Sequence, residues 1–289
     1  MAEQKAQVII IGGGPAGVSA ALYLARAGVR TTIIENGPGA LARAHKIDNY
    51  YGIAASGARL YAAGLEQAEA LGVSIRQDEV LSVEYTDSFT LSLKTTAEQL
   101  SAPALILATG TKNITLNLPG LVQLEGKGIS YCAVCDGFFF RKKQVAVLGS
   151  GAYALHEAAY LRHLAQSVTI LTNGQSGEAA QSAGFDVKTA KLVQLNGDSR
   201  LTGISFDDGS TLEVDGLFIA MGTADSTDIA RKLGAQTNGR FIKIDADGKT
   251  NIPGLFAAGD CTGGLLQVSK AVHEGAQAGL AALNFIRSK

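Results

Sequence analysis

The glycine pattern near the N-terminus constrains the fold of this chain more than any other feature. It reads Gly12-Gly13-Gly14-Pro15-Ala16-Gly17. An apolar run at residues 7–11 precedes it and an amphipathic segment follows it, so the expected order is strand, turn and helix. In such a turn the first glycine permits the bend, the second lets the backbone approach a pyrophosphate, and the third lets the helix pack on the strand. The pattern therefore predicts a parallel α/β sheet with a dinucleotide at the start of the first helix.

The strand expected at residues 31–34 ends at an acid, Glu35. A carboxylate at the end of the second strand can accept hydrogen bonds from both ribose hydroxyls of an adenosine. A glycine-rich turn that binds no ligand is the weaker interpretation, because it would need neither the strand–helix setting nor the acid. The turn and the acid together predict a binding site for an adenine dinucleotide.

A second glycine pattern stands in the middle of the chain. The apolar run at residues 144–148 leads to Gly149, Gly151 and Ala154 with the same spacing. A helix to about residue 166 and a further strand are expected after it. The chain therefore contains two units of the same kind.

Two further apolar runs, before and after the second glycine unit, are expected to form strands. Residues 104–110 are expected to form a buried strand followed by a small turn. Residues 254–260 are expected to form a strand that ends at Asp260 in a loop, and a long C-terminal helix follows. We therefore predict an α/β protein with two Rossmann-like domains, the second inserted into the first. The predicted boundaries are 1–115 and 239–289 for the outer domain and 116–238 for the inserted domain.

The chain has 3 cysteines, and two of them, Cys132 and Cys135, form a C-x-x-C motif. In a reducing compartment this spacing indicates a redox disulfide or half of a zinc site. A structural zinc site takes four Cys or His ligands at close spacings, whereas Cys261 lies far downstream and the histidines are scattered. We therefore interpret the pair as a redox disulfide, expect no metal, and interpret Cys261 as a small buried thiol.

Charge and hydropathy exclude other classes of protein. A formal net charge of -1 with 46% hydrophobic residues gives no general attraction to nucleic acid or to an anionic membrane. No apolar run reaches the ~18 residues of a membrane span. The first glycine turn begins too close to the N-terminus for a cleavable signal peptide to precede it. We expect a cytoplasmic protein that binds neither nucleic acid nor membrane.

Four motifs, GGGPAG, LATG, SYCAVCDG and GLFAAGD, follow one another over nearly the whole chain. In this order and spacing they resemble the low-molecular-weight thioredoxin reductases, and SYCAVCDG just before the second glycine turn is the most specific of them. The resemblance implies FAD in the outer domain and an NADPH-type inserted domain that carries the redox pair. It also implies a homodimer whose substrate is the disulfide of thioredoxin or of a thioredoxin-like protein.

The resemblance also assigns the site residues. Cys132, Cys135 and Asp136 are the expected catalytic group, with Cys135 facing the flavin. Asp136 is suited to protonate a thiolate, and helix N-capping is its alternative role. The N-terminus of the last helix is expected to stabilise negative charge on the reduced flavin. The expected cofactor-binding residues are Gly12, Gly14, Pro15, Ala16, Gly17, Glu35, Asn49, Ala108, Thr109, Gly110, Gly259, Asp260, Gln267 and Val268.

The chain departs from the family after the second nucleotide strand, where the family has His-Arg-Arg to clamp the NADPH 2′-phosphate. Here the residues are Thr172-Asn173-Gly174, and no Lys or Arg occurs from Leu164 through Val187. NADH would need a carboxylate at this strand end, and Thr172 is neutral. Lys188 or Lys191 could fold back and restore part of a phosphate site.

This departure favours reduced ferredoxin as the electron donor, as in the ferredoxin-dependent flavin thioredoxin reductases, which lack the clamp. Two alternatives stay open: an NADPH-dependent reductase with an atypical phosphate site, and a flavin-bearing redox sensor that binds a partner without turnover. Two smaller departures lie near the flavin, since Gly39-Ala40-Leu41 lacks the family's amide and Leu266 precedes Gln267 in place of arginine. The basic run 141–143 could meet an acidic partner.

Overall fold

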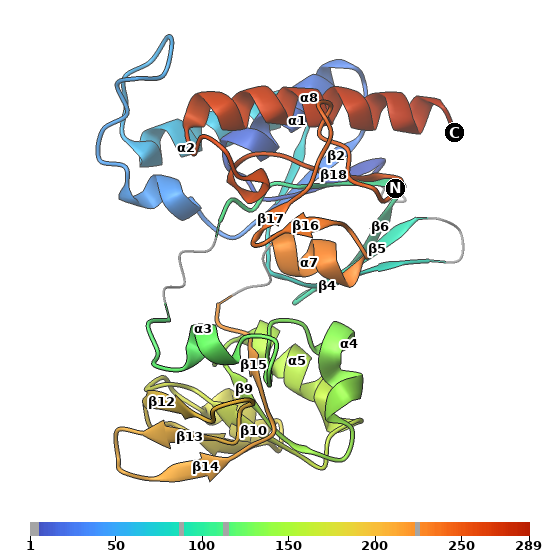
Figure 1. Cartoon of the computed structure of the whole chain (residues 1–289). Coiled ribbons are helices and arrows are strands. Elements are labelled where there is room, and N and C mark those ends of the chain that lie inside the picture. Colours follow the sequence, from blue (N-terminus) through green and yellow to red (C-terminus); the bar gives the residue numbers. More distant parts are fainter. Residues whose placement is uncertain (1–5, 87–89, 112–115, 223–225) are drawn as a thin grey trace. The chain divides into compact units, whose positions relative to one another are not determined.

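The computed structural model describes residues 6–86, 90–111, 116–222 and 226–289. The chain divides into two compact units (Figure 1). Unit 1 comprises Met1–Lys112 and Asp225–Lys289, and unit 2 comprises Asn113–Ala224. One continuous segment therefore forms unit 2, and the two ends of the chain together form unit 1.

Unit 1 is built on a parallel sheet with the strand order β18-β7-β1-β2-β3. The strands are β1 (Val8–Ile11), β2 (Thr31–Glu35), β3 (Ser74–Gln77), β7 (Ala104–Leu107) and β18 (Leu255–Ala257). Every residue of β1 and β7 is buried. This is the burial expected of short, continuously apolar strands in a parallel sheet that is covered on both faces.

Helices α1 (Pro15–Arg26) and α8 (Val268–Arg287) run side by side in unit 1 (Figure 1). Small residues allow their backbones to approach. A Cβ atom on Gly275 would lie 2.1 Å from the carbonyl oxygen of Ala16, and one on Gly279 would lie 2.8 Å from that of Ala20. The start of the chain and its end are therefore packed backbone against backbone, with no room for larger side chains.

The other elements of unit 1 surround this core. An antiparallel sheet has the order β4-β5-β6, and a short hairpin joins β16 to β17. These strands are β4 (Val80–Tyr85), β5 (Leu91–Thr95), β6 (Gln99–Ala102), β16 (Thr237–Asn238) and β17 (Phe241–Ile242). The remaining helical elements are η1 (Gly39–Arg43), α2 (Gly57–Ala70), α7 (Ser226–Lys232) and η3 (Asp260–Thr262).

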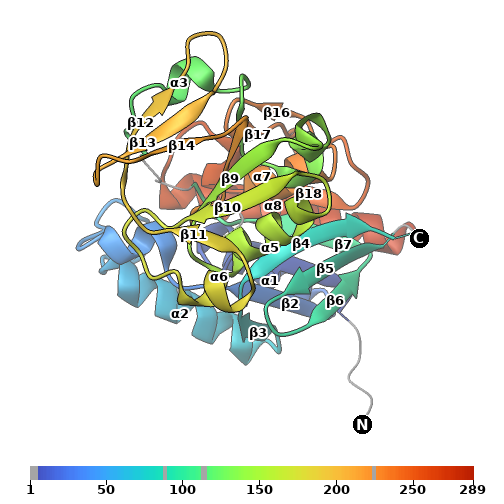
Figure 2. The same cartoon turned by 90° about the horizontal axis from the view of Figure 1, so that it is seen from below.

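Unit 2 repeats the parallel design with the strand order β11-β10-β9-β15-β8, and β9, β10 and β11 lie side by side in Figure 2. Its strands are β8 (Ile129–Ser130), β9 (Gln144–Leu148), β10 (Ser167–Leu171), β11 (Asp186–Lys188) and β15 (Gly216–Ile219), with β12 (Leu192–Asn196), β13 (Gly203–Phe206) and β14 (Thr211–Glu213) in an antiparallel sheet. Its helical elements are α3 (Leu121–Leu124), α4 (Ala133–Asp136), η2 (Gly137–Phe140), α5 (Ala152–Arg162) and α6 (Glu178–Ser182).

Both units place a glycine turn between a buried strand and the helix that follows, at β1–α1 and at β9–α5. The predicted fold class, two Rossmann-like α/β units with the second inserted into the first, is thereby confirmed. Within the described part of the chain, no helix is both long and apolar enough to cross a bilayer.

The return from unit 2 to unit 1 differs from the predicted boundary at residues 238 and 239, because the structure assigns residues 226–238 to unit 1. Hydrogen bonds within unit 1 explain the difference. The Ser226 hydroxyl lies 2.8 Å from that of Thr109, and the Thr227 hydroxyl donates to the carbonyl of Arg240 at 2.8 Å. The turn at residues 238–239, read from the sequence as a hinge, connects β16 to β17 inside this unit. The other predicted boundary, after residue 115, lies outside the described residues.

Candidate active site

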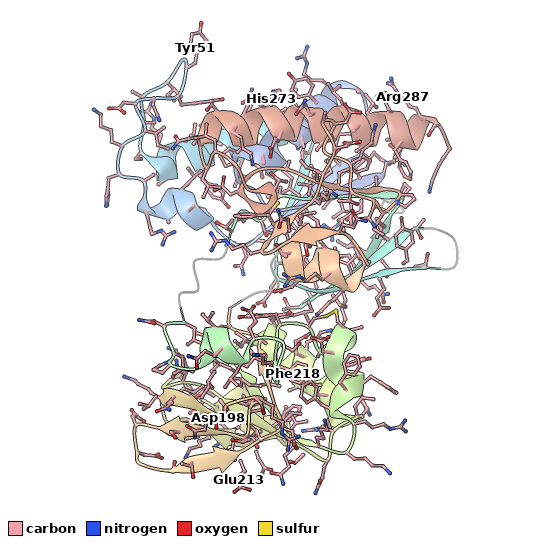
Figure 3. The ribbon with its side chains drawn as sticks, in the orientation of Figure 1. Tyr51, Asp198, Glu213, Phe218, His273 and Arg287 are labelled. Atoms are coloured by element: carbon pink, nitrogen blue, oxygen red, sulfur yellow. A yellow bond between two sulfur atoms is a disulfide. The ribbon has the colours of Figure 1, made fainter. Side chains whose placement is uncertain are left out.

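The C-x-x-C cysteines of unit 2 form a disulfide at the start of α4. Cys132 and Cys135 are bonded, with their Cα atoms 5.3 Å apart, and Figure 3 draws such sulfur–sulfur bonds in yellow. Cys132 is the N-cap residue of α4, and the backbone N–H of Cys135 donates to its Sγ at 3.1 Å. Cys132 is only 4% exposed, whereas Cys135 is exposed. An external group therefore reaches Cys135 more readily than Cys132.

Asp136 is the last residue of α4, and the Ser130 hydroxyl connects its carboxyl group to Cys132. Its Oδ2 accepts a hydrogen bond from Ser130 Oγ at 2.7 Å, and Ser130 Oγ accepts one from the Cys132 N–H at 3.1 Å. The carboxyl group makes no capping bond to the helical turn that follows. The side chain is partly buried, and Ser130 links it to the backbone of Cys132.

Glu157 is a site residue that the sequence prediction missed. It lies on α5 and is 2% exposed, and its Oε2 accepts a hydrogen bond from the Ala133 N–H at 2.9 Å. Ala133 stands between the two cysteines, so a buried carboxylate from the neighbouring helix holds the turn that carries the disulfide. The signal in the sequence is an acid on the buried stripe of α5, next to Ala154, Ala158 and Leu161.

The first glycine turn of unit 1 is shaped for a dinucleotide. Gly12 has φ +113, and a Cβ atom there would lie 2.3 Å from the Ala108 carbonyl oxygen. A Cβ atom on Gly17 would lie 1.9 Å from the Gly12 carbonyl oxygen. Gly14, the N-cap residue of α1, has open space around it and no side-chain cap. The first N–H groups of α1 are therefore accessible to a pyrophosphate.

Glu35 ends β2 and is 7% exposed. Its Oε2 accepts hydrogen bonds from the Gly37 N–H at 2.6 Å and from the Tyr61 hydroxyl. Burial and the neighbouring Glu35 raise the pKa of Tyr61, so this phenol keeps its proton and remains a donor. Both of these hydrogen bonds are made by Oε2 rather than by Oε1.

Asp260 lies in η3 and is partly buried. Burial raises its pKa, and the nearby charge of Lys270 acts in the opposite direction. Asn49 and Gln267, far apart in the sequence, are brought together, since Asn49 Nδ2 donates to Gln267 Oε1 at 3.1 Å. Gln267 is the N-cap residue of α8 and makes no side-chain cap. The start of α8, which lacks a side-chain cap, therefore lies beside this pair.

The loop that carries Asp260 is fastened by an ion pair that the sequence did not reveal. Lys270 and Glu274 form a 3.0 Å salt bridge on α8, with side chains 14% and 17% exposed. Lys270 Nζ donates to the carbonyl oxygens of Gly259 at 2.8 Å and Gly263 at 2.6 Å. Glu274 Oε2 accepts from the Gly259 N–H and the Thr262 hydroxyl, both at 2.8 Å. We call this arrangement of Lys270, Glu274 and residues 259–263 the loop latch.

Two other predicted residues have structural partners. Thr109 exchanges hydrogen bonds with Ser226, whose N–H donates to Thr109 Oγ1 at 3.0 Å. Cys261 is 1% exposed, and its thiol donates to the carbonyl oxygen of Ala258 at 3.3 Å. Burial raises the pKa of Cys261 to about 12. This cysteine is therefore protonated at neutral pH, and the environment of a buried packing thiol is the one expected for it.

The end of strand β10, where a nucleotide phosphate clamp would stand, is filled by local protein contacts. Thr172 is 2% exposed, and its hydroxyl donates to the Gln175 carbonyl at 2.7 Å. Asn173 Oδ1 accepts from the Leu192 N–H at 3.0 Å. Asn173 and Gly174 have φ 51 and 87, a left-handed backbone that disfavours long side chains. The turn is therefore neutral, and its backbone does not suit a pair of arginines.

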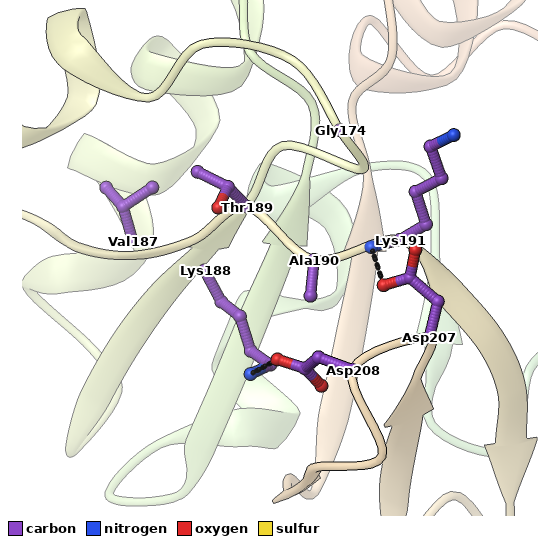
Figure 4. Close-up of a pocket in the computed structure, with 8 residues that line it drawn as sticks. All are labelled: Gly174, Val187, Lys188, Thr189, Ala190, Lys191, Asp207 and Asp208. Atoms are coloured by element: carbon purple, nitrogen blue, oxygen red, sulfur yellow. Dashed lines mark hydrogen bonds and ion pairs between the residues drawn. The ribbon is translucent and has the colours of Figure 1, made fainter.

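Beside this turn lies a cavity of about 540 Å³ whose lining includes Lys188, Lys191, Asp207 and Asp208 (Figure 4). Lys188 Nζ is 3.2 Å from Asp208 Oδ2 and lies over the Phe206 ring. Hydrogen bonds from Ser210 lower the pKa of Asp208 to about 2, so the anion persists at neutral pH. The Lys191 ammonium points away from both aspartates in Figure 4. The cavity therefore carries an anion where a phosphate would need cations only.

Comparison with known proteins agrees with this geometry. A model of the pyridine nucleotide-disulphide oxidoreductase family matches residues 6–275. A thioredoxin reductase from Streptomyces coelicolor is 35% identical over 274 residues, covering 88% of this chain and 85% of the relative. The crystal structure of the atypical thioredoxin reductase TRi from Desulfovibrio vulgaris Hildenborough has 42% identity and a TM-score of 0.92, covering 99% of both chains.

A ferredoxin-flavin thioredoxin reductase from Clostridium acetobutylicum is also similar, with 29% identity, a TM-score of 0.73 and 99% of both chains covered. Thioredoxin reductases of this kind are FAD-binding flavoproteins, and the glycine turn with the buried Glu35 carboxylate fits the dinucleotide part of FAD. The chain therefore belongs to the pyridine nucleotide-disulphide oxidoreductase family and, within it, to the low-molecular-weight thioredoxin reductase type.

Proposed function

We propose that this protein reduces the disulfide of thioredoxin, or of a thioredoxin-like protein, through FAD and the Cys132–Cys135 pair, with reduced ferredoxin as the electron donor. The Cys132–Cys135 disulfide at the start of α4 supports the thioredoxin part of the proposal. The neutral, internally bonded turn at the end of β10 supports the ferredoxin part.

In unit 1 we assign the turn from Gly12 to Gly17 and the N-terminus of α1 to the FAD pyrophosphate, and Glu35 to the adenosine ribose. We assign Asp260 and the N-terminus of α8 to the flavin side, where the helix dipole stabilises negative charge by about 0.3–2 kcal/mol. To the same cofactor site we assign the other predicted contacts, which are Pro15, Ala16, Asn49, Ala108, Thr109, Gly110, Gly259, Gln267 and Val268. Bound at these residues, FAD would supply the two-electron chemistry that links the donor to the disulfide.

The chemistry of the cysteine pair balances with these electrons. Two electrons and two protons break the Sγ–Sγ bond and leave two thiols, and we assign Asp136 to exchange one of the protons. One cysteine then attacks the thioredoxin disulfide as a thiolate and forms a mixed disulfide. The other cysteine displaces reduced thioredoxin and closes the Cys132–Cys135 bond again. We assign the exposed Cys135 to the side that faces the flavin.

The donor assignment depends on what a nicotinamide nucleotide would find in unit 2. The loss of two charge-assisted arginine–phosphate bonds, each worth about 1.5–3 kcal/mol, lowers affinity by roughly 10²–10⁴. Lys188 is already paired with Asp208, which leaves Lys191 as the cation beside the cavity that could serve an atypical phosphate site. NADH finds no carboxylate at the strand end, because Thr172 is neutral and its hydroxyl is bonded to Gln175.

Anaerobic reduction of the flavin tests the donor. Reduced ferredoxin should bleach the flavin rapidly and drive thioredoxin turnover, and NADPH or NADH at millimolar concentration should bleach it slowly or not at all. Rapid, saturable reduction by micromolar NADPH would contradict the ferredoxin assignment. If that reduction is lost in Lys191→Met but kept in Lys188→Met, the atypical phosphate site lies at Lys191. Flavin reduction by ferredoxin without thioredoxin turnover would instead favour the redox sensor.

Unit 2 offers a surface beside the disulfide for a protein partner. Phe138 and Phe139 are 67% and 70% exposed, with ring centroids 6.5 Å apart. We propose that this aromatic pair contacts thioredoxin, since exposed aromatic side chains are typical of interface anchors. The basic run 141–143, which is also exposed, is our candidate for docking the acidic ferredoxin. Charge reversal there should slow reduction by ferredoxin and weaken its salt dependence.

We also propose that the protein is a homodimer, as the resemblance to the thioredoxin reductases implies. Light scattering of the FAD-loaded protein measures its mass directly. A mass of one chain, 29.9 kDa, over the micromolar range would contradict a dimer and would leave the thioredoxin reductase activity itself untouched.

A further inference from the structure

The buried carboxylate of Glu157 has no part in the reaction as described so far. It reaches from α5 to the N–H of Ala133, the residue that follows Cys132, at 2.9 Å. Both ends of this contact are inaccessible to solvent, since Glu157 is 2% exposed and Ala133 0%. A hydrogen bond of this kind, made to a carboxylate away from water, is among the stronger contacts available to a backbone amide.

The contact gains importance when the disulfide opens. Reduction by two electrons and two protons breaks the Sγ–Sγ bond, so the turn then depends on noncovalent contacts alone. Within the turn, the Asp136 N–H donates to the Cys132 carbonyl at 3.1 Å. From outside it, Ser130 Oγ accepts the Cys132 N–H at 3.1 Å, and Glu157 accepts the Ala133 N–H. The Glu157 hydrogen bond ties the turn to helix α5.

We propose that Glu157 is a positioning residue for the redox pair: it holds the Cys132–Cys135 turn in the same geometry in the disulfide and in the dithiol state, and so lowers the reduction potential of the pair. Two thiols held close together re-form their bond more readily than two thiols on a loose turn, because less conformational freedom is lost on closure. A pair with a lower potential is the stronger reductant toward a protein disulfide.

This inference rests on the redox role proposed for the pair, but its test needs neither ferredoxin nor thioredoxin. The FAD-loaded protein is equilibrated with dithiothreitol buffers of defined ratio, and the fraction of reduced pair is measured by alkylation and mass. A failure of the potential to respond to Glu157 variants would overturn only the positioning role. A failure of turnover with thioredoxin would concern only the proposed function.

Two variants separate the reach of the side chain from its charge. Glu157→Asp keeps the charge but withdraws the acceptor by one methylene, and we expect it to favour the dithiol about tenfold, a rise of about 30 mV in potential. Glu157→Gln keeps an acceptor oxygen at full reach without the charge, and we expect a change of less than threefold. Glu178→Gln on α6, an exposed glutamate of the same unit, is the matched control and should leave the potential unchanged.

The amide of Ala133 gives a second measurement. In the reduced wild-type protein its hydrogen exchange should be slow, and in reduced Glu157→Asp it should be faster by about the same factor of ten. A potential for Glu157→Asp within twofold of the wild type, in a variant with unchanged circular dichroism, would overturn the proposal. Equal shifts in Glu157→Asp and Glu157→Gln would also overturn it, because charge and not positioning would then set the potential.

Discussion

The loop latch makes a prediction whose size follows from its contacts. In Lys270→Met, the Gly259 and Gly263 carbonyls lose their donor, and Glu274 loses its ion-pair partner in a site where its side chain is 17% exposed. Removal of one partner from a buried pair costs about 3–5 kcal/mol. Glu274 keeps the Gly259 N–H and the Thr262 hydroxyl as donors, so we expect a smaller loss, about 2–3 kcal/mol, in the free energy of unfolding of unit 1.

FAD binding should weaken as well, because the loop carrying Asp260 must then be ordered by the cofactor. Fixing the backbone of a single residue costs roughly 1–2 kcal/mol, which corresponds to about a tenfold rise in the dissociation constant of FAD. Flavin fluorescence during dilution measures this constant, and urea denaturation measures the stability. Lys249→Met is the matched control, since Lys249 pairs with Asp247 on the exposed surface and its loss should change neither quantity. A dissociation constant for Lys270→Met within twofold of the wild type would refute the reasoning.

Three further predictions concern the cofactor and the cysteines. Glu35→Ala should raise the dissociation constant of FAD roughly 10–10²-fold, since one charge-assisted bond between a ribose hydroxyl and Oε1, worth about 1.5–3 kcal/mol, is lost, whereas Tyr61→Phe should change it less than threefold; equal effects would contradict the ribose role. Cys132→Ser and Cys135→Ser should each abolish thioredoxin reduction and leave the flavin reducible. A long-wavelength thiolate–flavin absorption band in Cys132→Ser, but not in Cys135→Ser, would identify Cys135 as the residue facing the flavin. Cys261→Ser should keep most activity, and the wild-type Cys261 thiol, with a pKa of about 12, should resist iodoacetamide at pH 9; complete loss of activity would reveal a third redox group.

The parts of the fold that were predictable are those governed by local pattern. The strand predicted at residues 144–148 is β9 to the residue, and the glycine turns lie where their spacing placed them. Both follow from short-range constraints, namely burial on two faces and backbone angles that only glycine adopts. The boundary at residue 238 was misplaced because a glycine turn looks the same in a hinge and in a hairpin. Only the contacts of Ser226 and Thr227 with unit 1 distinguish the two.

The parts of the site that were missed depend on contacts between distant segments. In the sequence, Glu157 is one acidic residue in a predicted helix. Its role follows from its hydrogen bond to Ala133, which lies 24 residues away in the chain. Lys270 and Glu274 have the i, i+4 spacing of an ordinary exposed helix pair, and nothing local indicates that a loop folds over them. The role of a buried charged side chain depends on the polar groups that it contacts in the folded protein. These contacts join segments that are distant in the sequence, so no periodic pattern in a single sequence predicts them.

The packing of α8 on α1 has a consequence for how the chain assembles as it is made. Strand β18 and helix α8 are synthesised after unit 2, and until then β7 lacks its neighbour β18 and the small-residue face of α1 lacks its partner α8. Unit 2 is one continuous segment and is complete earlier. Since domains fold as units during synthesis, unit 2 can fold on the ribosome while unit 1, whose first strand is made earlier, waits for β18 and α8.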